Sequence, residues 1–192
     1  LNGCNINEKN DSIISIEILH NDTLTLDTHI DIPLTYMTEI DPSGNTDLQV
    51  DLPKLRKGNL DSGFWVVYTP QDYLTKEAYA EALEIAEIRN NAIHALTKKH
   101  SDYFELALKA EDVGRIVNNG KHAVLIGMEN AFPLGENLKD VNLWAERGVR
   151  YMGITHFGHN QFGDSSNPST DRNETKSKWN GLSPLGRELI SS

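Results

Sequence analysis

Two residues of metal-ligand type stand two positions apart at the end of a short alternating pattern of apolar and polar residues, Leu-Thr-Leu-Asp-Thr-His-Ile-Asp-Ile-Pro at 24–33. They are His29 and Asp31. Side chains two apart on a β-strand point to the same face, with their Cα atoms about 6.6 Å apart. An imidazole and a carboxylate at that spacing can share one cation, and zinc suits this ligand pair best. The alternative interpretation is that Asp31 caps the turn before Pro33 and His29 is an ordinary half-buried histidine.

The rest of the chain alternates between strand-like and helix-like segments. Apolar strand patterns follow at 63–68, 122–128 and 149–155, and helical patterns at about 76–99, 110–119 and 138–147. Thr75 is placed to cap the first of these helices, and the other two stop at Gly120 and Gly148. The order helix, glycine, strand occurs twice, which is typical of βα units with parallel strands.

Polar residues recur where these strand patterns end. The first pattern ends in His29 and Asp31, the third in Glu129 and the fourth in Thr155-His156. The carboxyl ends of the strands form the active-site face of a parallel barrel. Alone, Glu129 would be interpreted as a helix cap. The recurrence instead favours a metal-centred hydrolase site on an α/β fold of the (β/α)8 TIM-barrel type.

Composition excludes several classes of partner. The chain has 192 residues, 38% of them hydrophobic, a formal net charge of -10 and no Lys/Arg cluster. This charge argues against nucleic acid and anionic membrane surfaces as partners. No apolar stretch is long enough to cross a membrane. The single cysteine excludes an internal disulfide and a multi-cysteine metal site.

That cysteine stands in Leu1-Asn2-Gly3-Cys4, which resembles the end of a bacterial lipoprotein signal. On this interpretation Cys4 carries a lipid anchor, and the protein lies in the bacterial cell envelope as a periplasmic or outer-surface lipoprotein. Residues 1–22 would then be a lipobox-like start and a polar tether, and residues 23–192 the barrel domain. The alternative is an unremarkable surface cysteine.

Five separated motifs carry a resemblance to a known family. From about Leu24 to its end, the chain resembles the membrane dipeptidase (renal dipeptidase) family of zinc metallopeptidases. The motifs are Asp-Thr-His-Ile-Asp-Ile-Pro at 27–33, Gly-Phe-Trp-Val-Val-Tyr-Thr-Pro at 63–70, Ile-Gly-Met-Glu at 126–129, Arg-Tyr-Met-Gly-Ile-Thr-His at 150–156 and Gly-Leu-Ser-Pro-Leu-Gly at 181–186.

The resemblance implies a barrel with two zinc ions that hydrolyses dipeptides through a metal-bound hydroxide. His29 and Asp31 would hold one ion, and Glu129 would bridge both. His156 would contact the substrate and stabilise charge on the peptide carbonyl oxygen, so Glu129 and His156 are the expected catalytic residues. The alternative within this fold is another metal-dependent amidohydrolase, acting on a cyclic amide or a deacylation substrate.

Several residues that the family uses have no counterpart in this sequence. In the family, two further histidine ligands of the second zinc and a later arginine and aspartate follow the Gly-Leu-Ser-Pro segment. The four predicted strands reach only to about residue 155, so we expect roughly the first half of a barrel. We therefore predict that the isolated chain is inactive. The alternative is a catalytically silent fragment that binds one metal weakly or pairs with a second copy as a homodimer, because half a barrel leaves open sheet edges.

For the remaining histidines and for the polar stretch near the end of the chain, we mostly predict roles outside the metal site. His159 follows the fourth strand, where it either lines the mouth of the site or is a solvated loop residue. The polar stretch 164–178 is predicted to be a mobile loop whose end Trp179 anchors. The other histidines, His20, His94, His100 and His122, are expected to have surface, packing or stability roles.

Overall fold

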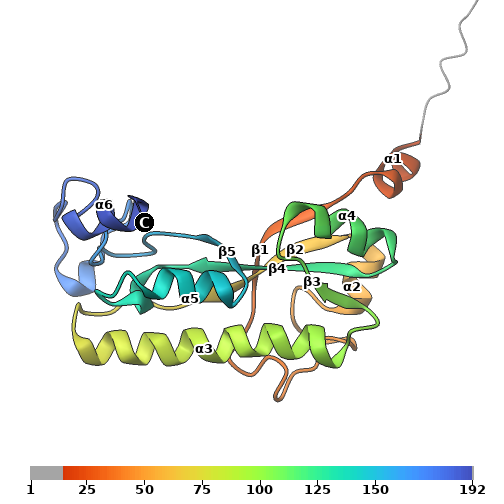
Figure 1. The fold of residues 1–192 in the computed structure, drawn as a ribbon, viewed down its shortest axis with the longest axis horizontal. Coiled ribbons are helices and arrows are strands. Elements are labelled where there is room, and N and C mark those ends of the chain that lie inside the picture. The colour runs from red at the N-terminus through yellow and green to blue at the C-terminus, as the bar shows by residue number, and fades with distance from the viewer. Residues whose placement is uncertain (1–14, 192) are drawn as a thin grey trace, which may run out of the picture.

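The computed structural model describes residues 15–191, which form an α/β fold around a parallel sheet (Figure 1). Strand β1 (Leu26–Asp31) pairs with β2 (Ser62–Tyr68), and β2 pairs with β4 (His122–Glu129). The other edge of β4 carries two strands, β3 (Phe104–Leu106) along its amino-terminal half and β5 (Val149–Met152) along its carboxyl-terminal half. All of these pairings are parallel, so the carboxyl ends of the strands lie on the same side of the sheet.

The helices begin and end close to the predicted positions. The long helix α3 (Lys76–Lys99) starts at Thr75, whose side chain accepts a hydrogen bond from the backbone N–H of Ala78. It runs along one face of the sheet, against β2, β3 and β4 (Figure 1). The other helices are α1 (Ile16–Asp22), α2 (Leu52–Gly58), η1 (Phe132–Leu134), α4 (Ala110–Asn118), α5 (Asp140–Glu146), η2 (Thr170–Arg172) and α6 (Pro184–Ser191).

Apolar side chains cover both faces of the sheet. On the face toward α3, Trp65 and Ile126 of the strands are buried together with Ile93 of the helix. On the opposite face, Leu125 packs with Phe64 and with Ile116 of α4. This burial of strand residues on two sides is what a parallel sheet requires, and it explains the near-continuous apolar pattern of β4.

A β-bulge in β1 sets the direction of its last residues. Asp27 pairs with Gly63 and Ile30 with Trp65, so β1 takes three steps where β2 takes two. Ile30 is thereby buried with Trp65, while His29 and Asp31 lie on the opposite, exposed side. The backbone N–H of His29 donates to the Asp27 carboxylate at 2.9 Å, which stabilises this irregular backbone.

Some predicted boundaries are wrong. The fourth predicted strand, β5, ends at Met152 and does not reach residue 155. The pairing of β5 with β4 stops there because β4 itself ends at Glu129. The last hydrogen bond between the two segments runs from the Gly153 N–H to the Met128 carbonyl. His156 therefore lies in the loop that follows. The three-residue strand β3 was not predicted.

The amino-terminal region bears on two further predictions. Helix α1, none of whose residues is buried, lies within the stretch predicted to be a polar tether and projects from the body of the fold (Figure 1). The predicted lipid anchor at Cys4 falls outside the residues that the structure describes. Within residues 15–191, no helix has both the length and the apolar character that a membrane span needs.

Candidate metal centre

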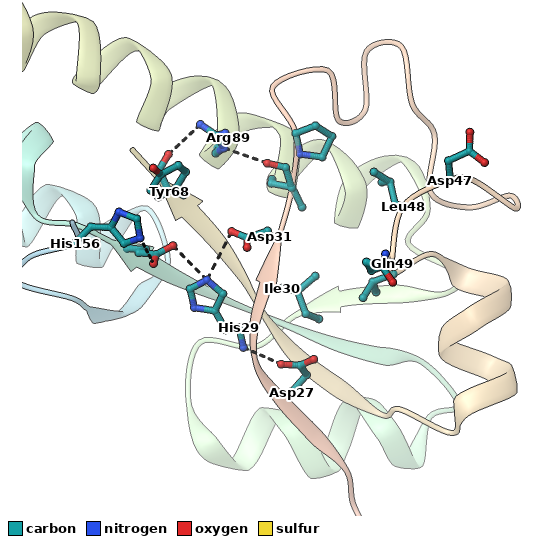
Figure 2. A pocket seen from close by; sticks show the side chains of 14 residues that line it. Asp27, His29, Ile30, Asp31, Asp47, Leu48, Gln49, Tyr68, Arg89 and His156 are labelled. Carbon is teal, nitrogen blue, oxygen red and sulfur yellow. Dashed lines mark hydrogen bonds and ion pairs between the residues drawn. The ribbon is translucent and has the colours of Figure 1, made fainter. Parts of the chain in front are cut away.

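The structure brings three of the predicted site residues together at the carboxyl ends of β1 and β4. His29 Nε2 lies 3.6 Å from Asp31 Oδ1 and 3.2 Å from Glu129 Oε2 (Figure 2). One ligand atom from each of the three residues lies within 4.8 Å of the others. The two carboxylates and the imidazole thus face one point from two strands that β2 separates.

This cluster is open to solvent on one side. The side chain of Asp31 is 71% exposed, that of His29 40% and that of Glu129 24%. Glu129 is the most enclosed because β4 lies between neighbouring strands. Imidazole nitrogen and carboxylate oxygen are donors that zinc accepts, and three protein ligands with an open side leave a position for water or substrate, as in catalytic zinc sites.

His156 reaches the same carboxylate from the loop after β5. Its Nε2 lies 3.3 Å from Glu129 Oε1, the oxygen that does not face His29. The imidazole stacks on the ring of Phe157, with centroids 4.5 Å apart and planes 15° apart, and meets the ring of Tyr68 edge-on at 5.1 Å. Glu129 is therefore placed between two imidazoles, one on each carboxylate oxygen.

A cleft of about 760 Å³ opens over these residues. Figure 2 shows the strand-end residues on one side and the loop bearing Asp47, Leu48 and Gln49 on the other. Part of the wall is apolar, which suits a small ligand with both polar and apolar groups. The lining residues are Asp27, His29, Ile30, Asp31, Ile32, Pro33, Asp47, Leu48, Gln49, Val50, Tyr68, Arg89, Glu129 and His156.

Tyr68 and Arg89 are among the lining residues that the sequence analysis did not assign to the site. Arg89 of α3 donates from Nε to the Ile32 carbonyl at 3.1 Å and from Nη1 to the Tyr68 carbonyl at 2.9 Å, which ties the ends of β1 and β2 together (Figure 2). Burial lowers the pKa of Arg89. Burial, and then the charge of Glu129, raise the pKa of Tyr68. The sequence carried one signal for Arg89: a charged residue on the apolar side of α3, between the buried Ala86 and Ile93.

His159 does not line this cleft, and it is not solvated either. Its side chain is buried, with Nδ1 accepting from the Ser165 N–H and Nε2 bonded to the Lys176 carbonyl, both at 3.0 Å. Both loop interpretations are therefore wrong. The ring is a packing element within its own loop.

The polar stretch 164–178 is held by hydrogen bonds, contrary to the predicted mobile loop. The Asp164 carboxylate accepts from the Ser177 hydroxyl and from the backbone N–H groups of Lys178 and Gly181. Burial would raise the pKa of Asp164, but these hydrogen bonds hold it well below its usual range. Trp179 anchors the end as predicted, because its Nε1 donates to the Asn160 carbonyl at 2.9 Å.

The sequence matches one family and several curated relatives. The family model described as membrane dipeptidase (peptidase family M19) matches residues 14–192. Dipeptidase ataJ of Aspergillus terreus is 32% identical over 165 residues, which are 80% of this chain and 39% of that protein. Dipeptidase 3 of Mus musculus is 27% identical over 172 residues, which are 86% of this chain and 33% of that protein. The chain thus spans well under half the length of these relatives.

Solved structures share the fold. The probable dipeptidase PvdM from Pseudomonas aeruginosa superimposes with a TM-score of 0.84 at 31% identity, over 91% of this chain and 45% of that one. A metallo peptidase from Rhodobacter sphaeroides, liganded with a phosphinate mimic of the dipeptide L-Ala-D-Ala, superimposes with a TM-score of 0.69 at 20% identity, over 88% and 56%. The prediction of part of a TIM-barrel-type α/β fold is confirmed.

Proposed function

The chain belongs to the membrane dipeptidase family, and from that premise we propose that it supplies the first metal site of a zinc-dependent dipeptidase. The observation that carries the proposal is the convergence of His29, Asp31 and Glu129 at the strand ends. The family match favours a dipeptide substrate over the cyclic amides or deacylation substrates of other metal-dependent amidohydrolases.

The spacing of the donor atoms supports a zinc ion at this point. Two ligand atoms that each lie about 2.1 Å from a tetrahedral zinc are about 3.4 Å from one another. The distances from His29 Nε2 to Asp31 and Glu129, 3.6 and 3.2 Å, lie on either side of that value. These two distances support a zinc ion shared by His29 with Asp31 and with Glu129, and the ligand atoms of all three residues lie within 4.8 Å of one another.

Glu129 is the residue that would connect this ion to a second one. Its Oε2 faces His29, whereas its Oε1 faces His156. A bridging role would engage both oxygens, which leaves Glu129 unavailable as a free general base. Within residues 15–191 no second group of three ligands was found, so in our proposal the other ligands of the second zinc come from a further part of the barrel.

The metal ions and the protein side chains would have separate roles in hydrolysis. The zinc ions would lower the pKa of a water molecule and polarise the scissile carbonyl. With both oxygens of Glu129 engaged by the two ions, the Nε2 of His156, which lies 3.3 Å from Oε1 here, would be free to donate a hydrogen bond to the carbonyl oxygen as negative charge develops there. Such a bond is worth roughly 3 kcal/mol for comparable donors. Tyr68 and the apolar wall of the cleft would exclude water and orient the dipeptide.

The test is a measurement of bound metal. In the full-length protein, we expect the double variant His29→Ala with Asp31→Ala to lose about one of two zinc ions. The matched control is His20→Ala, which removes an exposed imidazole on α1 and should leave the zinc content unchanged. Full zinc content in the double variant would refute the site.

A further inference from the structure

An ion pair in the loop after β5 lies close to His156 without touching it. Arg172 Nε and Glu174 Oε1 are 3.2 Å apart, and their side chains are only 15% and 14% exposed. Asn173, between them, adopts a left-handed backbone with φ 57°. Charges this enclosed are costly unless each finds further partners.

Those further partners are backbone groups on either side of one short turn. Arg172 donates from Nη2 to the Phe157 carbonyl at 3.2 Å, and the Glu174 carboxylate accepts from the His159 N–H at 3.0 Å. Arg172 also donates from Nη1 to the Gln71 carbonyl at 3.0 Å, in the segment that follows β2. The pair thus joins the turn after His156 to the exit of β2.

The turn itself is shaped to receive the guanidinium. Gly158 has φ +93°, and a Cβ built on it would lie 1.6 Å from Arg172 Nη2. A side chain at this position would therefore displace Arg172. Burial would raise the pKa of Glu174, but hydrogen bonds from the Ser169 and His159 N–H groups, and from Arg172, lower it, so the carboxylate stays charged to hold the arginine.

The two segments joined in this way supply the two aromatic neighbours of His156. Phe157, on which the imidazole stacks, offers its carbonyl to Arg172, and Tyr68, which meets the ring edge-on, ends the strand that leads to Gln71. We propose that the Arg172–Glu174 pair positions the His156 imidazole against Glu129. Its effect on catalysis, though not its effect on geometry, rests on the dipeptidase function proposed above.

The geometric part can be tested by NMR of histidine labelled with ¹³C, with His156→Asn identifying the His156 signal. A ring stacked on Phe157 has a ring proton shifted upfield, and Arg172→Met should move this proton toward the position of a free histidine. Glu174→Gln, which is milder, should move it in the same direction. The control is Arg147→Met, which breaks a more exposed arginine–glutamate pair with Glu87 on other elements and should leave the signal in place. An unmoved His156 signal in both loop variants would overturn the proposal.

The catalytic part can be tested by a double-mutant cycle in the full-length protein. We expect Arg172→Met to lower kcat about tenfold with KM and zinc content unchanged, Arg172→Lys to restore part of it, and Arg172→Met to have no further effect in a His156→Ala background. An equal loss in both backgrounds would show that the pair only stabilises the loop. Absence of dipeptidase activity in the unaltered protein would instead refute the proposed function, and the NMR result would still decide the positioning role.

Discussion

Gly127, in the middle of β4, is a position where one added methyl group tests the packing beneath the metal centre. A Cβ there would lie 2.2 Å from Cζ and 2.5 Å from the hydroxyl oxygen of Tyr151. The backbone of Gly127 is not left-handed, so alanine fits it without conformational strain. In Gly127→Ala the Tyr151 ring must therefore leave its place.

The cost follows from what the ring loses. It packs on Phe64 with centroids 4.9 Å apart, a contact worth about 1 kcal/mol. Its hydroxyl donates to the Thr28 carbonyl at 3.1 Å, worth about 1 kcal/mol more. Overpacking adds about 1–3 kcal/mol, and replacing glycine in a strand returns about 0.5–1 kcal/mol. Together these contributions lead us to expect that Gly127→Ala lowers the free energy of unfolding by about 2–4.5 kcal/mol.

Urea denaturation of four proteins checks this: the unaltered chain, Gly127→Ala, Tyr151→Ala and the double variant. Once Tyr151 is truncated the clash is gone, so Gly127→Ala should then be neutral or slightly stabilising. Gly114→Ala in α4 is the control, because a Cβ there meets nothing within 4 Å and the change should stabilise. The same cost of Gly127→Ala with and without the Tyr151 ring would refute the reasoning.

Three further predictions follow from the site and the fold. His156→Ala should lower kcat of the full-length enzyme about a hundredfold with zinc content unchanged, measured by steady-state kinetics and metal analysis; loss of zinc would make His156 a ligand instead. Burial would raise the pKa of Asp51, but hydrogen bonds from Lys54 and Thr46 lower it to about 2 from its ordinary 3.8, so its stabilisation is present above pH 3.8 and lost as the pH falls toward 2. Acid unfolding of Asp51→Asn should accordingly show about 2 kcal/mol less stability at pH 7 and a smaller loss in that pH window; an unchanged acid transition would contradict this. Residues 1–192 assayed alone with added zinc should turn over neither L,L- nor L,D-dipeptides, because the described residues supply the ligands of one metal only; turnover comparable to that of a whole-barrel protein would show that the ligand count is wrong.

The strands that bear the site residues were predictable because the apolar pattern of each strand is visible in its own sequence. His29 and Asp31 alternate with apolar residues, and β4 is a long apolar run that ends in Glu129. The three residues of β3 are too few to show a period, and their strand conformation depends on the edge of β4, where Phe104 pairs with His122. The end of β5 likewise depends on where β4 ends.

The loop after β5 was mispredicted for a different reason. A polar composition does not reveal whether the polar groups bond to water or to one another. In this loop Asp164 and Glu174 each accept at least two backbone N–H groups, so a stretch that resembles a solvated linker is internally bonded. Arg89 was missed in the same way, because its partners are carbonyls of strands distant in the sequence.

The parallel direction of all the strands also governs the time at which the site forms. Parallel neighbours cannot be joined by hairpins, so each pairing must first close a long stretch of chain, which makes folding slow. His29 on β1 cannot approach Glu129 on β4 until β2 has docked between them. Zinc in the proposed site would therefore bind only after these three strands have paired, late in folding. Interactions made that late leave the folding rate nearly unchanged and slow unfolding, so the metal would give the protein kinetic persistence as well as chemistry.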